Sequence, residues 1–234
     1  MENKTWSVQQ TINDFLQKET EERKNKKAEY FYASSLGSCK RKQIWKRMNE
    51  PETNPADNRT LRIFSVGNIF HEWIQDLLEK AGVLINKEQT IINEEYNYKG
   101  RYDALCEKDG KKLLYDIKSQ SSRSFHYLKE KGGGIDEAKK MQVVSYAVMG
   151  NLPVEECRIL FVSKDDLCVM EFSVAVKDFK QKVIDELVEL NKFFKNKEIP
   201  AELPLESGKV NWQCGYCNYR DKCKNKGRQN NKIT

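Results

Sequence analysis

The sequence predicts an α/β fold in which helices flank a mixed central β-sheet. Asp109-Gly110 lies between two runs of strand-forming residues, a pattern typical of a β-hairpin with a two-residue type I′ turn. A helical pattern over residues 136–149 separates this hairpin from a strand at 157–164, and such a crossover joins parallel strands. Residues 177–197 form a long amphipathic helix that can cover one face of the sheet.

Composition indicates one large domain with polar ends. The chain has 234 residues, of which 32% are charged, and a net charge of +6, which permits an anionic partner without demonstrating one. We expect a polar N-terminal segment over residues 1–29, a main domain over 30–223 and a disordered basic tail over 224–234. No signal-peptide pattern or run of about 18 apolar residues is present, so we expect a cytoplasmic protein that does not enter a membrane.

The first chemically distinctive stretch covers residues 34–50. Cys39 precedes three basic residues, and Trp45 follows them within one predicted helix. Basic side chains beside an aromatic ring suit nucleic acid, so Arg41 and Trp45 are candidate DNA contacts. The alternative is that Trp45 belongs to the core and the charges lie on the surface.

A helix over residues 62–80 follows a loop at 51–60 and ends before Gly82. His71 lies within or beside the apolar stripe of this helix, where a histidine is usually a packed core residue. Residues 84–98 then form a strand with a loop. Glu88 on this strand is either a further carboxylate of a site or an ordinary surface residue.

The stretch from Gly100 to Lys118 organises the rest of the chain. The predicted turn places Asp103 directly opposite Asp116 and Lys118 opposite Arg101. Facing carboxylates repel each other, so this pair favours a bound cation, and Mg²⁺ or Mn²⁺ prefers such oxygen ligands. The alternative is a solvated hairpin face whose charges serve solubility. Arg101 is a further candidate DNA contact.

The helix over residues 136–149 carries Gln142 and Tyr146 on one face, because they are four positions apart. Both side chains can orient a phosphate or an attacking water, or they can simply border the core.

Seven cysteines in a reducing compartment point to metal rather than to disulfides. Cys214, Cys217 and Cys223 lie within ten residues, and a tetrahedral zinc site or an iron–sulfur cubane needs a fourth thiol. Cys39 is the candidate, because the three remaining cysteines lie in strand contexts and are interpreted as core residues.

These residues together resemble the RecB-type branch of the PD-(D/E)XK nuclease superfamily. The resemblance covers about residues 34–223 and rests on Gly100-x-x-Asp103, Asp116-Ile117-Lys118, Gln142-x-x-x-Tyr146 and the upstream His71. It implies a restriction-endonuclease-like fold, a metal site and a catalytic set. The implied metal ligands are His71, Asp103, Asp116 and the Ile117 carbonyl, and the implied catalytic residues are Asp103, Asp116, Lys118, Gln142 and Tyr146. Asp116 stands where glutamate is common in the family.

The cysteine order resembles that of CRISPR-associated RecB-like exonucleases and of AddB-type nuclease domains. This resemblance implies a four-iron four-sulfur cluster on Cys39, Cys214, Cys217 and Cys223, in a small subdomain that joins residues 30–50 and 200–223. Structural zinc on the same four thiols is the alternative.

The resemblance implies a metal-dependent DNA exonuclease that acts on single strands or DNA ends in CRISPR spacer acquisition, an antiviral defence pathway, with CRISPR integration proteins as partners. A phage or repair nuclease, and a catalytically idle iron–sulfur adaptor that binds DNA, are the alternatives. A zinc-stabilised interaction protein is a third class, which a brown colour would exclude.

Overall fold

The computed structural model describes residues 6–24, 26–130, 134–205 and 209–224. Its centre is a six-stranded mixed sheet with the strand order β1-β3-β4-β5-β6, in which β2 pairs with β3. The β4–β5 pair is parallel and the β3–β4 and β5–β6 pairs are antiparallel, so the predicted mixed sheet is confirmed. The strands are β1 (Phe31–Tyr32), β2 (Leu84–Asn93), β3 (Tyr98–Lys108), β4 (Lys111–Gln120), β5 (Glu156–Ser163) and β6 (Val169–Ala175).

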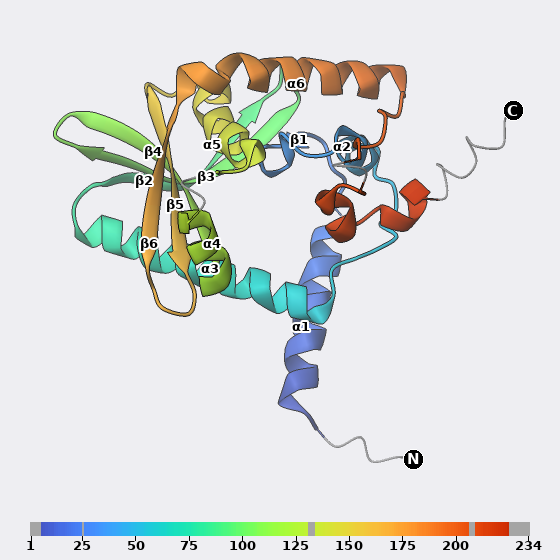
Figure 1. Cartoon of the computed structure of the whole chain (residues 1–234), viewed down its shortest axis with the longest axis horizontal. Coiled ribbons are helices and arrows are strands. Elements are labelled where there is room, and N and C mark those ends of the chain that lie inside the picture. Colours follow the sequence, from blue (N-terminus) through green and yellow to red (C-terminus); the bar gives the residue numbers. More distant parts are fainter. Residues whose placement is uncertain (1–5, 25, 131–133, 206–208, 225–234) are drawn as a thin grey trace, which may run out of the picture.

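Helices lie on both sides of this sheet (Figure 1). One core cluster joins α5, α6 and one sheet face and includes Leu114 and Leu187, whereas a smaller cluster packs Ile74 of α3 against Ile117 on the other face. The predicted flanking helices are therefore confirmed. The α-helices are α1 (Val8–Lys24), α2 (Lys40–Arg47), α3 (Asn58–Lys80), α4 (Ser122–Glu130), α5 (Glu137–Met149) and α6 (Val176–Asn196), and the 3₁₀ helices are η1 (Ala33–Ser35) and η2 (Trp212–Tyr216).

The hairpin of β3 and β4 has the predicted turn and the predicted register where its strands pair. Asp109 and Gly110 both have positive φ, at 52° and 76°, as a type I′ turn requires. The paired residues run from Lys108–Lys111 to Ala104–Tyr115 and stop there. The predicted cross-strand pairs Asp103–Asp116 and Arg101–Lys118 do not belong to this ladder, because β4 diverges from β3 after Tyr115 and β1 pairs with the same edge of β3 at Tyr98 and Lys99.

The helix that carries His71 starts earlier than predicted. Asp57 caps it, since the Thr60 backbone N–H donates to the Asp57 carboxylate at 2.8 Å, and α3 therefore begins at Asn58 instead of residue 62. Helix α4 was not predicted at all, although Phe125 packs its buried face into the core. Within the described residues, no helix is long and apolar enough to cross a membrane.

The N-terminal half of the chain meets the C-terminal segment around α2. The Trp45 and Tyr219 rings lie 5.6 Å apart between centroids, and the Asn218 carbonyl accepts from the backbone N–H groups of Thr53 and Asn54 at 2.9 and 2.8 Å. These contacts bring residues near 40–54 beside residues near 217–222. Residues 225–234 of the predicted basic tail lie outside the described residues.

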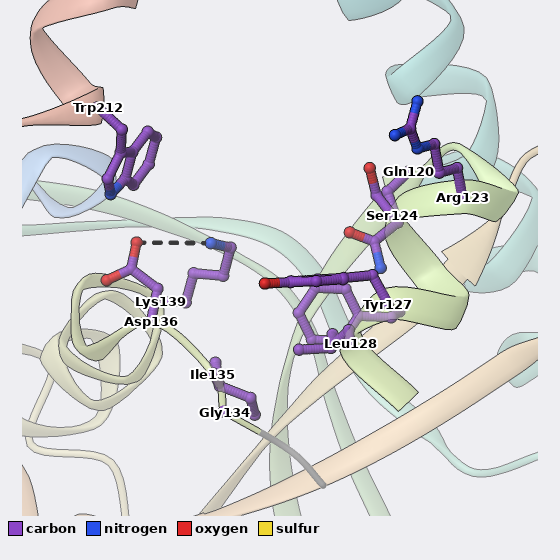
Figure 2. Close-up of a pocket in the computed structure, with 11 residues that line it drawn as sticks. Gln120, Arg123, Ser124, Tyr127, Leu128, Gly134, Ile135, Asp136, Lys139 and Trp212 are labelled. Carbon is purple, nitrogen blue, oxygen red and sulfur yellow. Dashed lines mark ion pairs between the residues drawn. The ribbon is translucent and has the colours of Figure 1, made fainter. Parts of the chain in front are cut away.

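Two cavities lie next to β4. The larger has a volume of about 790 Å³ and lies between α4, the start of α5 and Trp212 (Figure 2). The smaller, of about 480 Å³, lies where α3, β2, β3, β4 and α5 meet. Lys118 lines the smaller cavity and Gln120 lines the larger, so the two cavities are neighbours along one strand.

Candidate active site

The smaller cavity opens at a fork in the sheet. Strand β2 pairs with one edge of β3 over most of its length, so β1 and β4 share the other edge. On that edge β1 pairs with Tyr98 and Lys99, and β4 pairs only from Ala104 onward. Residues 100–103 therefore face a gap between the two neighbouring strands, and the side chains of the site occupy this gap.

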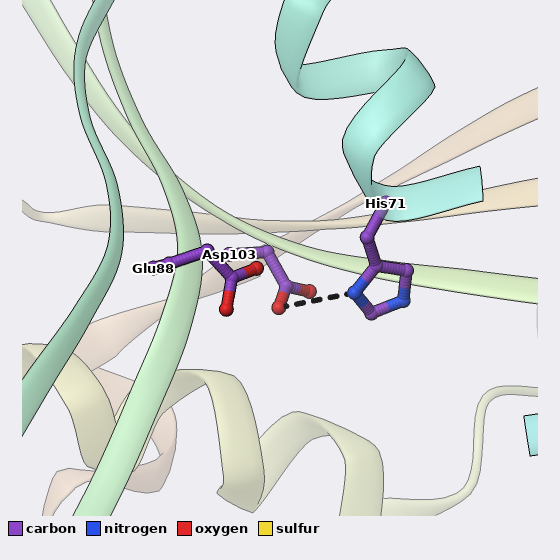
Figure 3. Close-up of side chains that lie close together, drawn as sticks. All are labelled: His71, Glu88 and Asp103. Carbon is purple, nitrogen blue, oxygen red and sulfur yellow. Dashed lines mark ion pairs between the residues drawn. The ribbon is translucent and has the colours of Figure 1, made fainter. Parts of the chain in front are cut away.

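Three candidate metal ligands converge beside the fork (Figure 3). His71 of α3, Glu88 of β2 and Asp103 of β3 place one ligand atom each so that all three lie within 4.8 Å of one another. The His71 Nδ1 atom is 3.4 Å from the Asp103 carboxylate. Imidazole and carboxylate groups together suit a divalent cation such as Mn²⁺ or Mg²⁺.

Glu88 reaches this group through an unusual backbone conformation. Its neighbours Lys87 and Gln89 pair with Ala104 and Tyr102, so the register places Glu88 opposite Asp103. Glu88 has φ = 53°, in the left-handed region that non-glycine residues rarely adopt. Such backbone strain concentrates at functional sites. From the sequence, Glu88 could be either a further carboxylate of the site or a surface residue. The sequence did not decide between them, because the position of Glu88 opposite Asp103 depends on the β2–β3 register.

Gln75 holds Glu88 and Asp103 of the three-residue group by hydrogen bonds, and it was not identified from the sequence. Its Nε2 atom donates to the Glu88 carboxylate at 2.7 Å and to the Asp103 backbone carbonyl at 2.9 Å. Gln75 is buried and lies one helical turn after His71 on α3. The four-residue spacing from His71 was the available signal.

The Asp103 side chain also links β3 to β4 beyond the point where backbone pairing between the two strands ends. Its carboxylate accepts the Ile117 backbone N–H at 2.6 Å, across the gap where β3 and β4 separate. The two predicted aspartates therefore lie near each other, although they are not a ladder pair. The contact fixes the Asp103 carboxylate between β4 and His71.

Asp116, Lys118, Gln142 and Tyr146 form a second, adjoining network. Lys118 Nζ lies 2.9 Å from the Asp116 carboxylate and donates to Gln142 Oε1 at 3.2 Å. The Gln142 amide donates to Asp116 at 3.1 Å and to the Tyr146 hydroxyl at 2.8 Å. The structure thus brings all four predicted residues together. Asp116 is not a member of the group within 4.8 Å, a place that Glu88 takes.

Burial and charge tune the ionisation of this network. Burial raises the pKa of Asp116, and the Asp103 charge adds to this effect while Lys118 opposes it. Burial lowers the pKa of Lys118, but Asp116 and Asp103 outweigh burial and the pKa is raised overall. Lys118 is therefore protonated at neutral pH. Burial lowers the pKa of His71 as well, but the hydrogen bond to Asp103 and the charges of Asp103 and Asp116 together outweigh burial, so the pKa is raised overall.

Gly100 makes room for the aromatic wall of the cavity. A Cβ atom at Gly100 would lie 2.3 Å from the Tyr98 hydroxyl and 2.9 Å from the Tyr146 ring. Contacts shorter than about 3 Å cannot be accommodated against two buried rings. The Gly100-x-x-Asp103 spacing therefore has a packing reason in this chain.

The four predicted thiols gather at the junction of α2 and the C-terminal segment. Cys39 occupies the N-cap position of α2, Cys214 lies in η2, and Cys217 and Cys223 follow it. Burial raises the pKa of the Cys214 thiol, and the proximity of Cys39, Cys217 and Cys223 raises it further. Cys106 and Cys157 are buried in strands, as expected, whereas Cys168 is exposed and lies between β5 and β6, so the prediction that it is a core residue was wrong. No three of the four thiols have sulfur atoms within 4.8 Å of one another, as judged over the described residues.

The structure changes the interpretation of one candidate DNA contact. Trp45 is only 1% exposed and packs against Tyr219, with Arg41 and Lys222 over its ring, so it cannot stack on a base. Arg41 donates to the Pro200 carbonyl at 2.8 Å, and its guanidinium lies 3.4 Å from the Cys223 sulfur. Both residues support the cysteine subdomain. Arg101 remains exposed and pairs with Glu88 at 2.8 Å.

Two solved structures resemble this fold. The protein SSO0001 superimposes with a TM-score of 0.56 and 21% identity over 91% of this chain and 96% of that chain. The alkaline exonuclease LHK-Exo from Laribacter hongkongensis superimposes with a TM-score of 0.52 and 13% identity, over 76% of this chain and 95% of that one. No family model and no curated protein matches the chain. At these identities the likeness shows the fold alone, a mixed sheet flanked by helices that this chain shares with both proteins.

Proposed function

We propose that this chain is a divalent-metal-dependent nuclease that hydrolyses phosphodiester bonds in DNA. The observation that carries the proposal is the convergence of His71, Glu88 and Asp103 beside a buried, cationic Lys118. That arrangement lies on a fold shared with an alkaline exonuclease. Asp116 and the Ile117 carbonyl complete the ligand set that we predict from the sequence.

The three clustered side chains and Asp116 would hold Mg²⁺ or Mn²⁺. When bound, such an ion polarises a phosphoryl oxygen and lowers the pKa of a coordinated water. Gln75 holds Glu88 in place, and the Ile117 backbone N–H holds Asp103. These outer contacts keep both carboxylates aimed at the cation before substrate arrives.

Lys118 supplies the positive charge that hydrolysis needs next to the scissile phosphate. Because its pKa is raised, it acts as a fixed hydrogen-bond donor and not as a general base. Asp116 holds the ammonium at 2.9 Å, and the Gln142 side chain receives a second hydrogen bond from it. A donor fixed in this way stabilises the charge that develops on phosphate oxygens in the transition state.

Gln142 and Tyr146 position these groups and the substrate strand. The Gln142 amide is fixed from both sides, since its nitrogen donates to Asp116 and Tyr146 and its oxygen accepts from Lys118. Burial and the Asp116 charge raise the pKa of Tyr146, so its hydroxyl stays neutral. A neutral hydroxyl beside two carboxylates adds no repulsion toward phosphate.

The cysteine group fits a four-iron four-sulfur cluster. The order of Cys39, Cys214, Cys217 and Cys223 in the sequence resembles that of iron–sulfur nucleases and supports a cluster in which each thiol binds a different iron. A structural zinc ion on the same four thiols is the alternative. The cluster would tie α2 to the C-terminal segment, and Arg41 would donate to one of its thiolates.

The resemblance of the sequence supports an exonuclease acting on single strands or DNA ends in CRISPR spacer acquisition, with integration proteins as partners. A repair or phage nuclease would need the same residues. Integrase genes next to this gene would support the CRISPR role, and recombination genes would favour repair.

A metal titration tests the nuclease proposal. Purified protein stripped of divalent ions should cleave labelled DNA only after addition of Mn²⁺ or Mg²⁺. Glu88→Gln should weaken Mn²⁺ affinity by at least about tenfold. Glu95→Gln, in the exposed turn after β2, is the matched control and should change nothing. Cleavage in excess chelator, or an unchanged Mn²⁺ affinity in Glu88→Gln, would contradict the proposal.

A further inference from the structure

The larger cavity lies next to the candidate active site along two elements. On β4, Gln120 projects on the same face as Lys118, about 7 Å farther along the strand. On α5, Lys139 lies one turn before Gln142 on the same face. A nucleic-acid strand with one phosphate at Lys118 would therefore place its neighbouring nucleotide at this cavity.

Two aromatic side chains line the cavity from different elements. Tyr127 of α4 is 58% exposed and Trp212 of η2 is 57% exposed. Figure 2 shows Trp212 on the side of α5 and Tyr127 on the side of α4, with open space between them. Large exposed rings leave apolar area in water, and a flat aromatic ligand would cover that area. Every nucleobase has such a face.

The polar groups of the cavity suit a nucleotide. Arg123 and Lys139 bring positive charge to opposite sides, and Asp136 partly neutralises Lys139 at 3.7 Å. The Nε2 atom of Gln120 is buried in the wall and has no hydrogen-bond partner within the described part of the chain. This unpaired amide group can donate to a ligand acceptor, such as a base edge or a phosphate oxygen, when the Gln120 side chain turns toward the cavity.

We propose that this cavity binds one unpaired nucleotide of a single DNA strand whose neighbouring phosphate lies in the active site. This inference rests on the proposed nuclease function and adds a subsite for the nucleotide next to the scissile phosphate. The base stacks on Trp212 and Tyr127, the Gln120 amide donates to it or to its phosphate, and Arg123 and Lys139 neutralise the backbone. A base inside a duplex is stacked and paired, so it cannot reach these rings. The cavity therefore selects single strands.

Binding measured without catalysis tests the subsite. The full chain, kept in chelator so that no cleavage occurs, is titrated with a labelled oligothymidylate and with a duplex of equal length. Trp212→Ala should weaken single-strand binding about 5- to 150-fold, the range for loss of one base stack. Trp212→Phe should recover most of this loss, and duplex binding should not change. Tyr216→Ala is the matched control, because Tyr216 is an 82% exposed ring on the same η2 segment outside the cavity.

An abasic scan separates base stacking from a general defect of folding. A single abasic nucleotide moved along the oligonucleotide should weaken binding to the wild-type chain at one position. The same substitution should cost nothing in Trp212→Ala, because the stack is already gone. Equal abasic penalties in both proteins, or an unchanged affinity in Trp212→Ala, would overturn the subsite.

The subsite and the nuclease proposal can fail separately. Metal-dependent cleavage with no role for Trp212 would overturn the subsite and leave the nuclease standing. Single-strand binding that depends on Trp212, in a protein that cleaves no DNA with any divalent ion, would overturn the nuclease proposal and leave the subsite standing.

Discussion

The carboxylate group and the cysteine group are supported by different kinds of contact. His71, Glu88 and Asp103 project from a helix and two strands whose backbones are fixed by ladder hydrogen bonds and by buried side chains. The four thiols instead lie on a helix cap and on a C-terminal segment that is joined to α2 mainly by side-chain contacts such as Trp45–Tyr219. The carboxylate group is thus organised before a cation binds, whereas the proposed cluster would supply much of the order of the cysteine group.

The comparison gives opposite expectations for the two sites. Changes at the carboxylate group should remove activity and leave stability nearly intact. Changes at the thiols should lower stability first.

The largest effect is expected at Asp103. Asp103→Asn should reduce metal-dependent cleavage by more than about 10³-fold, beyond the loss of one transition-state donor. The melting temperature should stay within about 2 °C of wild type, because the asparagine oxygen can still accept the Ile117 N–H. Single-turnover cleavage and thermal unfolding measure the two quantities. A large loss of stability would show that Asp103 serves mainly as a structural link between β3 and β4.

Lys118 should show the next largest effect. Lys118→Ala should lower the single-turnover rate about 10²- to 10³-fold, because a fixed donor to the phosphate is lost. Mn²⁺ affinity should change little, since a protonated lysine is no metal ligand. Lys112→Ala is the control, because Lys112 is an exposed lysine at the other end of β4. If weaker DNA binding explains the whole loss of activity, Lys118 only binds the substrate and does not stabilise the transition state.

The cysteine site should respond in stability and colour. Cys217→Ser should remove the brown colour that we expect of the proposed cluster and lower the melting temperature by about 5–10 °C, the shift that about 2–3 kcal/mol causes in a chain of this size. Cys106→Ser should keep the colour, because Cys106 is buried in β3 away from the group. Absorption near 400 nm and thermal unfolding are the measurements. Bleaching in Cys106→Ser, with colour retained in Cys39→Ser, would mean that the fourth ligand is wrong.

The smallest effect concerns an anchor of Cys39 that needs no metal. Glu186 of α6 accepts the Gly37 backbone N–H at 2.9 and 3.0 Å, and burial raises the pKa of Glu186 above its usual 4.5. A raised folded pKa means that this group stabilises the fold fully below pH 4.5 and loses that contribution as pH rises through the raised value.

Glu186→Gln keeps an acceptor for Gly37 and removes the titration. The melting temperature of wild type relative to this variant should therefore fall as pH rises from 4.5 through the raised pKa of Glu186. Thermal unfolding between pH 4 and pH 8 measures the difference. A constant difference over this range would show that Glu186 has the same pKa in the folded and unfolded states.

Local sequence signals predicted most of the fold. The Asp-Gly turn set the register of the β3–β4 ladder, and the four-residue spacing of Gln142 and Tyr146 set their common face. The predictions that failed concern contacts between residues that are distant in the sequence. Glu88 reaches the site through a left-handed backbone conformation, and Asp103 bonds Ile117 where the ladder ends, neither of which has a sequence pattern. Trp45 was taken for a possible DNA contact, because its neighbours in sequence are basic while its partner Tyr219 is distant.

The separation of the four thiols along the chain determines when each site can form during synthesis. The side chains of the candidate active site lie between His71 and Tyr146, so the ribosome has made all of them well before Cys214. At typical elongation rates the interval to Cys223 is on the order of ten seconds. A nascent chain can therefore bring the side chains of the candidate active site together while Cys39 still lacks its partner thiols, and insertion of the proposed cluster would come last.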